Sequence, residues 1–179
     1  MASAPLPLPV LRSARVVLRP LAEDDLTTLV PAVAEDGVRE WWGTPEPVER
    51  EADGLRNDGC AFAVEAEGAL AGWVGFHEEL EHDYRHAALD IFLRSGFRDR
   101  GIGREALALA ARWLISERGH HRLTIDPSAG NARAIRTYEA VGFRPVGILR
   151  RYERGPDGRW RDGLLMDLLA EELTSSASR

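Results

Sequence analysis

The sequence predicts a single mixed α/β domain, built on a central twisted sheet of about seven strands that is flanked by about four helices. Three observations favour this class. The chain has 179 residues, of which 44% are hydrophobic and 29% charged, as in an ordinary globular domain with one core. Segments with the two-residue period of strands alternate with segments at helical spacing. Two strand-like segments also flank one long amphipathic segment, an order that predicts parallel strands joined by a helix.

The first half of the chain is predicted to contain three strands and two helices. The first strand places Val16 and Leu18 on one face, and the first helix carries Leu26, Leu29 and Val33 at helical spacing. In order, these elements are strand Arg15–Pro20, helix Ala22–Ala34, a turn-rich segment at Asp36–Pro47, helix Val48–Leu55, strand Cys60–Ala66 and strand Ala69–Glu79, the last two joined by a hairpin at Glu67-Gly68.

The second half is predicted to contain four strands and two helices. Glycines end both helices, and Asn131 is a typical N-cap residue for the second. These elements are strand Ala87–Leu93, helix Arg104–Glu117, strand Arg122–Asp126, helix Ala132–Val141, and strands Phe143–Arg154 and Arg161–Leu169 around a turn at 155–158. We expect residues 1–12 to form a flexible lead-in, 13–173 the single domain and 174–179 a frayed tail.

Charge and residue usage exclude several classes of function. The formal net charge of −6 works against nucleic-acid binding and mildly favours a cationic partner. No apolar run approaches the roughly 18–20 residues that span a membrane, and the proline-rich start lacks the basic region of a signal peptide. Cys60 is the only cysteine, which favours the cytoplasm. The adjacent His120 and His121 would face opposite sides of a strand, so no metal site is predicted.

A glycine turn, Arg98-Asp99-Arg100-Gly101-Ile102-Gly103, follows the strand Ala87–Leu93 and precedes a helix. Glycines let a backbone approach a ligand closely, and the free N–H groups at a helix start favour an anion. The pattern predicts a pyrophosphate site. A dinucleotide-binding fingerprint fits the Gly101–Ala106 segment less well, because Ser95–Arg100 intervenes between the strand and this turn. No Gly-Lys-Ser/Thr follows, which excludes a P-loop. An ordinary helix-capping turn remains an alternative.

Two polar residues share one face of the helix after the break at 127–130. Asn131 and Tyr138 are seven residues apart, which is close to two helical turns, so both side chains point to nearly the same side. That face is otherwise apolar. Tyr138 could serve chemistry there, or it could simply pack its ring in the core with the hydroxyl at the edge.

Two carboxylates stand where a ligand could reach them. Asp90 interrupts an apolar strand, where a carboxylate either faces solvent or lines a pocket and holds a cation or a proton. Asp126 ends the next strand, at the edge where α/β clefts bind ligands, although an Asp before Pro127 also suits a turn. Both interpretations stay open at each position.

Together these motifs resemble the GNAT N-acetyltransferases. The resemblance rests on Arg98-x-x-Gly101-x-Gly103 after a strand, followed by Asn131-x-x-Ala134-x-x-x-Tyr138-Glu139-x-x-Gly142-Phe143. It implies that the pyrophosphate belongs to acetyl-CoA, that Asn131 contacts the pantetheine arm and that Tyr138 protonates the departing thiolate. The donor-binding residues that it implies are Ile91, Phe92, Leu93, Arg98, Arg100, Gly101, Ile102, Gly103, Arg104, Asn131, Ala134 and Tyr138.

Within that superfamily, the segment Thr124–Glu139 looks most like the aminoglycoside 6′-N-acetyltransferases, and Trp41-Trp42-Gly43 matches a further motif of that group. This implies that Asp90 is the base or the ammonium-binding group, and that Asp126, Trp41 and Trp42 contact the acceptor. The segments 147–150 and 158–162 look more like ribosomal-protein N-terminal alanine acetyltransferases. A polyamine acetyltransferase and a non-catalytic acyl-CoA sensor would also fit the resemblance.

The residues agree with direct acetyl transfer in a ternary complex. A carboxylate such as Asp90 can attract an ammonium group and take its proton, directly or through water. Backbone N–H groups at the splayed end of Ala87–Leu93 can stabilise the oxyanion. Cys60 has no neighbouring histidine and is expected to be a small buried residue rather than a nucleophile. A homodimer and a role in antibiotic resistance stay open.

Overall fold

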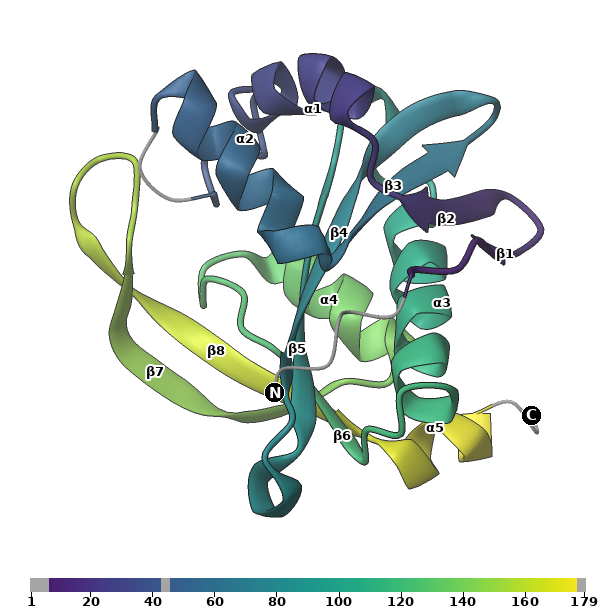
Figure 1. Cartoon of the computed structure of the whole chain (residues 1–179). Coiled ribbons are helices and arrows are strands. Elements are labelled where there is room, and N and C mark those ends of the chain that lie inside the picture. The colour runs from purple at the N-terminus through teal and green to yellow at the C-terminus, as the bar shows by residue number, and fades with distance from the viewer. Residues whose placement is uncertain (1–6, 43–45, 177–179) are drawn as a thin grey trace.

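Eight strands form one mixed sheet in the computed structural model, which describes residues 7–42 and 46–176 (Figure 1). The strand order is β1-β2-β3-β4-β5-β6-β8-β7, and among these neighbours only β5 and β6 run parallel. The predicted parallel pair around the long central helix is therefore confirmed. The strands are β1 (Leu11–Arg12), β2 (Val16–Pro20), β3 (Ala61–Ala66), β4 (Ala69–Glu79), β5 (His86–Leu93), β6 (Arg122–Ile125), β7 (Arg144–Arg154) and β8 (Trp160–Leu169).

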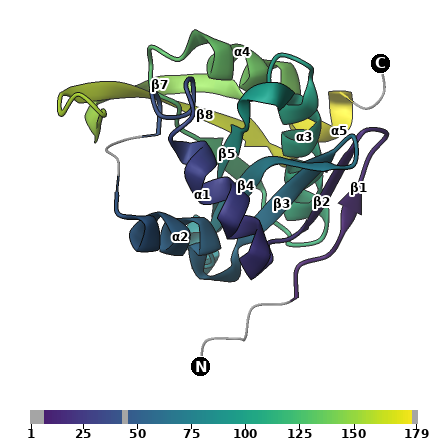
Figure 2. The same cartoon turned by 90° about the horizontal axis from the view of Figure 1, so that it is seen from above.

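Helices cover both faces of this sheet. In the view from above, α1 and α2 lie on one side and α3 and α4 on the other (Figure 2). The described helices are α1 (Leu26–Val33), α2 (Val48–Arg56), α3 (Ile102–Ser116), α4 (Ala132–Val141) and α5 (Ala170–Ser176), with short 3₁₀ turns at Glu23–Asp25, Asn57–Gly59, His82–Tyr84 and Ser95–Phe97.

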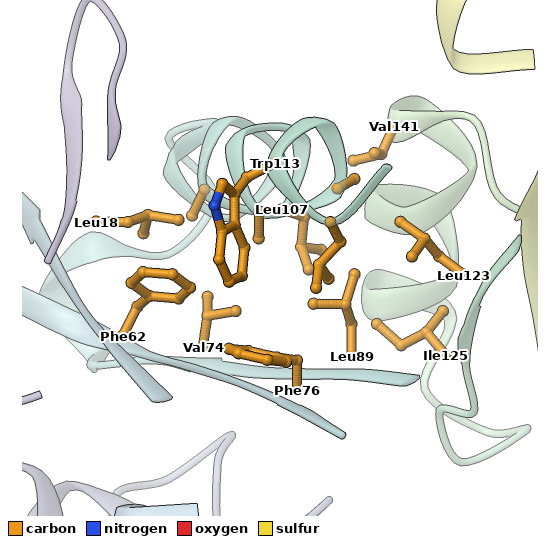
Figure 3. Packing of buried hydrophobic residues seen from close by; sticks show 14 of the residues in the cluster. Leu18, Phe62, Val74, Phe76, Leu89, Leu107, Trp113, Leu123, Ile125 and Val141 are labelled. Carbon is orange, nitrogen blue, oxygen red and sulfur yellow. The ribbon is translucent and has the colours of Figure 1, made fainter. Parts of the chain in front are cut away.

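The larger core lies between α3 and the sheet, where Trp113 and Leu107 point toward the strands (Figure 3). The Trp113 ring meets the Phe62 ring edge-on, with 5.4 Å between the centroids. The face predicted for this helix is confirmed, because its four residues Leu107, Ala110, Ala111 and Leu114 are fully buried.

A second core lies on the opposite face, under α1 and α2. Trp73 of β4 and Phe92 of β5 stack there with 6.0 Å between their ring centroids. Trp42, which follows α1, packs edge-on against both rings at 5.8 and 5.0 Å. The tryptophan at position 42 is therefore held by the sheet, although the neighbouring residues 43–45, including Gly43 of the predicted motif, lie outside the described residues.

Several element boundaries differ from the predicted ones. β1 raises the strand number to eight, since Leu11 and Arg12 pair with Leu18 and Val17 inside the expected lead-in. α1 begins only at Leu26, because a 3₁₀ turn precedes it. α3 begins at Ile102, two residues early, because the chain turns at Gly101. Part of the expected tail is helical in α5, whereas residues 1–6 and 177–179 lie outside the described residues.

β5 and β6 separate soon after they begin. They pair only at Ala87 with Leu123 and at Ala88 with Thr124. Beyond these residues β5 keeps β4 as its partner on one edge, and its other edge opens toward the start of α4. This splay leaves backbone groups of β5 available along the cleft.

Candidate functional site

The turn after β5 forms a cradle at the start of α3. Asp99 and Gly101 have φ angles of +58° and +78°, and this bend directs the first turn of α3 toward the cleft. The first N–H groups of a helix have no partner within the helix, so they are available to an anion. A cavity of about 410 Å³ lies beside them. Its lining includes the guanidinium-bearing residues Arg98, Arg104, Arg133 and Arg136.

Most residues that the sequence suggested for the donor line this cavity. Those present are Ile91, Phe92, Leu93, Arg98, Gly101, Gly103, Arg104, Asn131, Ala134 and Tyr138. Two are not among its lining. The Arg100 guanidinium instead donates to Glu67 and to the Gly96 carbonyl. The Ile102 side chain is 2% exposed and packs in the core, so that its backbone N–H is what it offers at the cradle.

Arg98 acts as a brace inside the cradle. Its Nε donates to the Leu93 carbonyl at 2.8 Å, and Nη1 donates to the Asp36 carbonyl. The guanidinium therefore ties the end of β5 to the loop that follows α1. Gly37 fits beneath it with a φ of +78°, and a Cβ there would lie 2.5 Å from Nη1. Burial and the nearby Arg133 lower the Arg98 pKa, while its charge remains at physiological pH.

Asn131 and Tyr138 lie on one face of α4, as the spacing predicts. The Asn131 amide oxygen accepts the Ala134 N–H at 3.1 Å and so caps the helix. Tyr138 is 7% exposed and packs edge-on against Phe143. Burial, together with the charges of Asp90 and Asp126, raises its pKa, so that the hydroxyl stays protonated. Both residues border the donor cavity and a second one.

Asp90 lies on the open edge of β5, and its side chain is exposed at the second cavity. Its Oδ1 accepts the Ile91 N–H at 2.9 Å. Loss of hydration beside the surrounding protein atoms raises the Asp90 pKa to about 7. The negative charges of Asp126 and Glu153 raise it further. A carboxyl group with that pKa can accept a proton near neutral pH.

The second cavity, of about 390 Å³, gathers the predicted acceptor residues. Trp41, Trp42, Asp90 and Asp126 all line it. It shares Tyr138 and Asn131 with the donor cavity, so that the two cavities meet at α4. The structure thus brings together groups that lie more than 90 residues apart in the chain.

Some lining residues had no place in the sequence prediction. Arg133 and Arg136 stand three residues apart on α4, and helical spacing could have placed them beside Ala134. Tyr152 and Glu153 of β7 line the acceptor cavity, and the Tyr152 hydroxyl donates to Asp126. Strand alternation alone could not find this pair, because the β7–β8 register shifts between Leu149 and Glu153.

A larger cavity, of about 760 Å³, lies elsewhere, between α1 and α2. Aliphatic residues such as Leu26, Val30 and Val48 form much of its wall. It lacks the glycine cradle and Tyr138, so its size does not make it the reaction site. Cys60 stands apart from the described cavities, and burial raises the pKa of its thiol, which makes the thiolate scarce.

Comparisons with known proteins identify relatives of the chain and of its fold. Residues 15–144 match the acetyltransferase (GNAT) domain family. An aminoglycoside N(6′)-acetyltransferase type 1 from Klebsiella pneumoniae is 27% identical over 166 residues, which cover 80% of this chain and 79% of that protein. A spermidine N-acetyltransferase from Vibrio cholerae, solved with CoA and spermine, has a TM-score of 0.78 at 22% identity, covering 90% of this chain and 99% of its own. A ribosomal-protein-S5-alanine acetyltransferase from Vibrio fischeri has a TM-score of 0.76 at 17% identity, covering 92% and 98%.

In the described residues, no helix has the length and apolar character needed to cross a membrane.

Proposed function

Because the chain belongs to the GNAT acetyltransferase family and is an N-acetyltransferase, we propose that it transfers the acetyl group of acetyl-CoA directly to a small cationic amine, such as an aminoglycoside. One observation carries the proposal. A cavity rich in arginine and a cavity rich in carboxylate meet at Tyr138. The first suits an anionic donor and the second a cationic acceptor, so the two reactants would meet beside a proton donor.

The cradle fits the donor in three respects. The open N–H groups of α3 suit a pyrophosphate, and the arginines of the cavity supply positive charge. The free edge of β5 offers backbone groups to an extended amide-containing arm, such as pantetheine. Gly103 lies beside this edge, where a Cβ would be 3.4 Å from Leu93 Cδ1, an ordinary contact distance.

Asp90 would prepare the acceptor. An amine arrives mostly as ammonium, and it must lose a proton before its lone pair can attack the thioester carbon. With a pKa of about 7, Asp90 can hold the ammonium group and accept that proton, directly or through water. The attack places negative charge on the carbonyl oxygen, and N–H groups on the open edge of β5 can stabilise it.

Tyr138 would complete the transfer. Collapse of the tetrahedral centre breaks the C–S bond, and the departing thiolate takes a proton from the Tyr138 hydroxyl. The new amide nitrogen gives its extra proton to the tyrosinate, directly or through water, and Asp90 releases the proton that it accepted to solvent, which restores both residues. The high pKa of Tyr138 keeps it protonated before this step. A covalent acyl-enzyme is not required.

The aminoglycoside assignment draws on the Klebsiella pneumoniae relative and on Asp90, Asp126 and Trp42 in the acceptor cavity. A polyamine is the second candidate, favoured by the fold shared with the spermidine acetyltransferase and by the same carboxylates. A ribosomal-protein N-terminus is the third. We place the reaction in the cytoplasm, because Cys60 is the only cysteine of the chain.

The test is a thiol-release assay with acetyl-CoA and a panel of aminoglycosides, polyamines and peptides with a free N-terminus. We expect turnover with aminoglycosides. Turnover with peptides alone would replace the acceptor, and acetyl-CoA binding without turnover on any amine would point to a sensor instead.

A further inference from the structure

The β7–β8 hairpin touches both walls of the acceptor cavity. On one side, the Tyr152 hydroxyl donates to Asp126 Oδ2, at the start of the loop that leads to α4. On the other, Arg161 Nη1 donates at 2.9 Å to the carbonyl of Glu40, the residue before Trp41. The hairpin therefore links the Asp126 wall to the tryptophan wall across the cavity.

A bulge in β7 turns two side chains into this cavity. The register with β8 shifts between Leu149 and Glu153, and Arg151 has a φ of +50°. The Arg151 N–H donates to Asp162 Oδ1 at 2.7 Å, which fixes the bulge to β8. Bulges commonly redirect a side chain toward a functional site. Here both residues that follow the bulge, Tyr152 and Glu153, line the cavity.

The absence of a side chain at Gly163 makes room for the Tyr152 ring. The ring lies over Gly163, where a Cβ would come within 2.9 Å of the ring Cδ1. Ser128, in the loop after Asp126, forms a bridge to the same glycine. The hydroxyl therefore donates to Asp126 Oδ2 from a fixed position. The other carboxylate oxygen, Oδ1, is then the one available to an acceptor.

The carboxylates of the cavity lack counterions. Within residues 7–42 and 46–176, no ion pair joins Asp90, Asp126 or Glu153 to a basic side chain, although ion pairs are frequent elsewhere on the surface. Tyr138, 7% exposed at the same cavity, also has no hydrogen-bond partner for its hydroxyl in this part of the chain. Unpaired anions around a recessed space attract cations, and they are spread from Asp90 on the sheet to Glu153 on the hairpin.

We propose that Tyr152 is a positioning residue that orients Asp126, and that Glu153 selects acceptors carrying a second cationic amine besides the one acetylated. This inference rests on the proposed acetyl transfer. Asp90 receives the reacting amine next to Tyr138, while Asp126 and Glu153 hold the second amine at the hairpin. The hairpin, rather than the donor site, thereby decides between monoamines and polyamines of any scaffold.

The first experiment tests Glu153. The kcat/KM of wild type and of Glu153→Gln is measured with butylamine, 1,4-diaminobutane, spermidine and an aminoglycoside at saturating acetyl-CoA. We expect wild type to prefer the multiply charged amines, and Glu153→Gln to lose about tenfold on them but less than twofold on butylamine. Glu81→Gln, at an exposed glutamate that does not line the cavity, is the matched control and should retain the wild-type preference.

The second experiment tests Tyr152. Tyr152→Phe keeps the ring on Gly163 but removes the bond to Asp126, so we expect the acceptor KM to rise about five- to tenfold. The kcat and the KM for acetyl-CoA should change less than twofold, a split that a general loss of folding would not give. Tyr84→Phe, at an exposed tyrosine outside the cavities, should change neither constant.

The outcomes separate this inference from the proposed function. An enzyme that acetylates amines but shows equal losses on butylamine and diamines in Glu153→Gln overturns the role of Glu153. An unchanged acceptor KM in Tyr152→Phe overturns that of Tyr152. If wild type acetylates none of these amines, the same probes are titrated by calorimetry onto the CoA-loaded protein. Equal affinities for butylamine and for the multiply charged amines would then overturn both roles.

Discussion

Asp90 Oδ1 accepts a hydrogen bond from the N–H of its own neighbour, Ile91, at 2.9 Å on the open edge of β5. The bond places the carboxylate beside the backbone donors that an oxyanion would use. The hydrogen bond also lowers the Asp90 pKa, but the loss of hydration around the carboxylate raises the pKa and has the larger effect. The expected base therefore lies on the same open strand edge as the backbone groups proposed for the oxyanion.

Asp90→Asn should remove the acidic limb of the pH profile. The Asp90 pKa of about 7 means that wild-type kcat/KM falls as the pH drops through 7, where the carboxylate becomes protonated. The groups that face it are Asp126, Glu153 and Tyr138, and the raised pKa of Tyr138 keeps its hydroxyl protonated through that range. In Asp90→Asn we expect a loss of about 10²-fold or more at pH 8 and no inflection near 7. An unchanged profile, recorded by thiol release from pH 5.5 to 9, would remove Asp90 from the mechanism.

The same substitution should stabilise the free protein at alkaline pH. The folded state raises the Asp90 pKa from 3.8 to about 7, so between these values it binds more protons than the unfolded chain. Stability from this group is therefore present at low pH and is lost as the pH rises toward 7. We expect the Tm of Asp90→Asn to exceed that of wild type at pH 8 and to approach it near pH 4. Thermal unfolding at both pH values, followed by circular dichroism, measures the difference.

Tyr138→Phe should separate chemistry from donor binding. The ring keeps its contact with Phe143, and the hydroxyl is lost at the junction of the two cavities. We expect kcat to fall about 10²-fold or more, while the Kd for acetyl-CoA from calorimetry changes less than threefold. If the kcat of Tyr138→Phe equals that of wild type, Tyr138 is a packing residue, the alternative that its place on the apolar face of the helix also allows.

Much of this arrangement follows from short-range patterns. Period and capping predict β5, α3 and α4 within a few residues, and the seven-residue spacing predicts that Asn131 and Tyr138 share a face. The roles of Arg98 and Arg100 could not be predicted in this way, since two arginines two residues apart look alike in the chain. Only the fold brings the Asp36 carbonyl to Arg98 and Glu67 to Arg100. The bulge that redirects Tyr152 depends likewise on pairing with β8.

Gly103→Glu should abolish acetyl-CoA binding. Position 103 lines the donor cavity in the first turn of α3, where a carboxylate would occupy the space and repel a pyrophosphate. A Cβ there meets only ordinary contacts, the nearest at 3.4 Å, so the fold should persist. Gly147→Glu on β7, with no atom within 4 Å of its Cβ, is the matched control. Calorimetry should show no heat for Gly103→Glu and normal binding for the control, and normal binding in both would relocate the donor site.

Arg98 and Arg100 should differ sharply in their contribution to stability, despite their similar place in the sequence. The Arg98 side chain is 12% exposed and donates to two carbonyls that join β5 to the loop after α1. Its removal breaks hydrogen bonds from a charged donor, one of them to the part-buried Leu93 carbonyl, which costs about 1–3 kcal/mol. The Arg100 side chain is 46% exposed in a surface pair with Glu67, and such pairs contribute about 0–1 kcal/mol. Urea unfolding of Arg98→Ala and Arg100→Ala should therefore show a clear loss of stability only for Arg98→Ala.

The Arg98 side chain also holds the loop that leads to Trp41 and Trp42, so Arg98→Ala should raise the acceptor KM as well. Equal midpoints for the two variants would mean that Arg98 serves the donor alone.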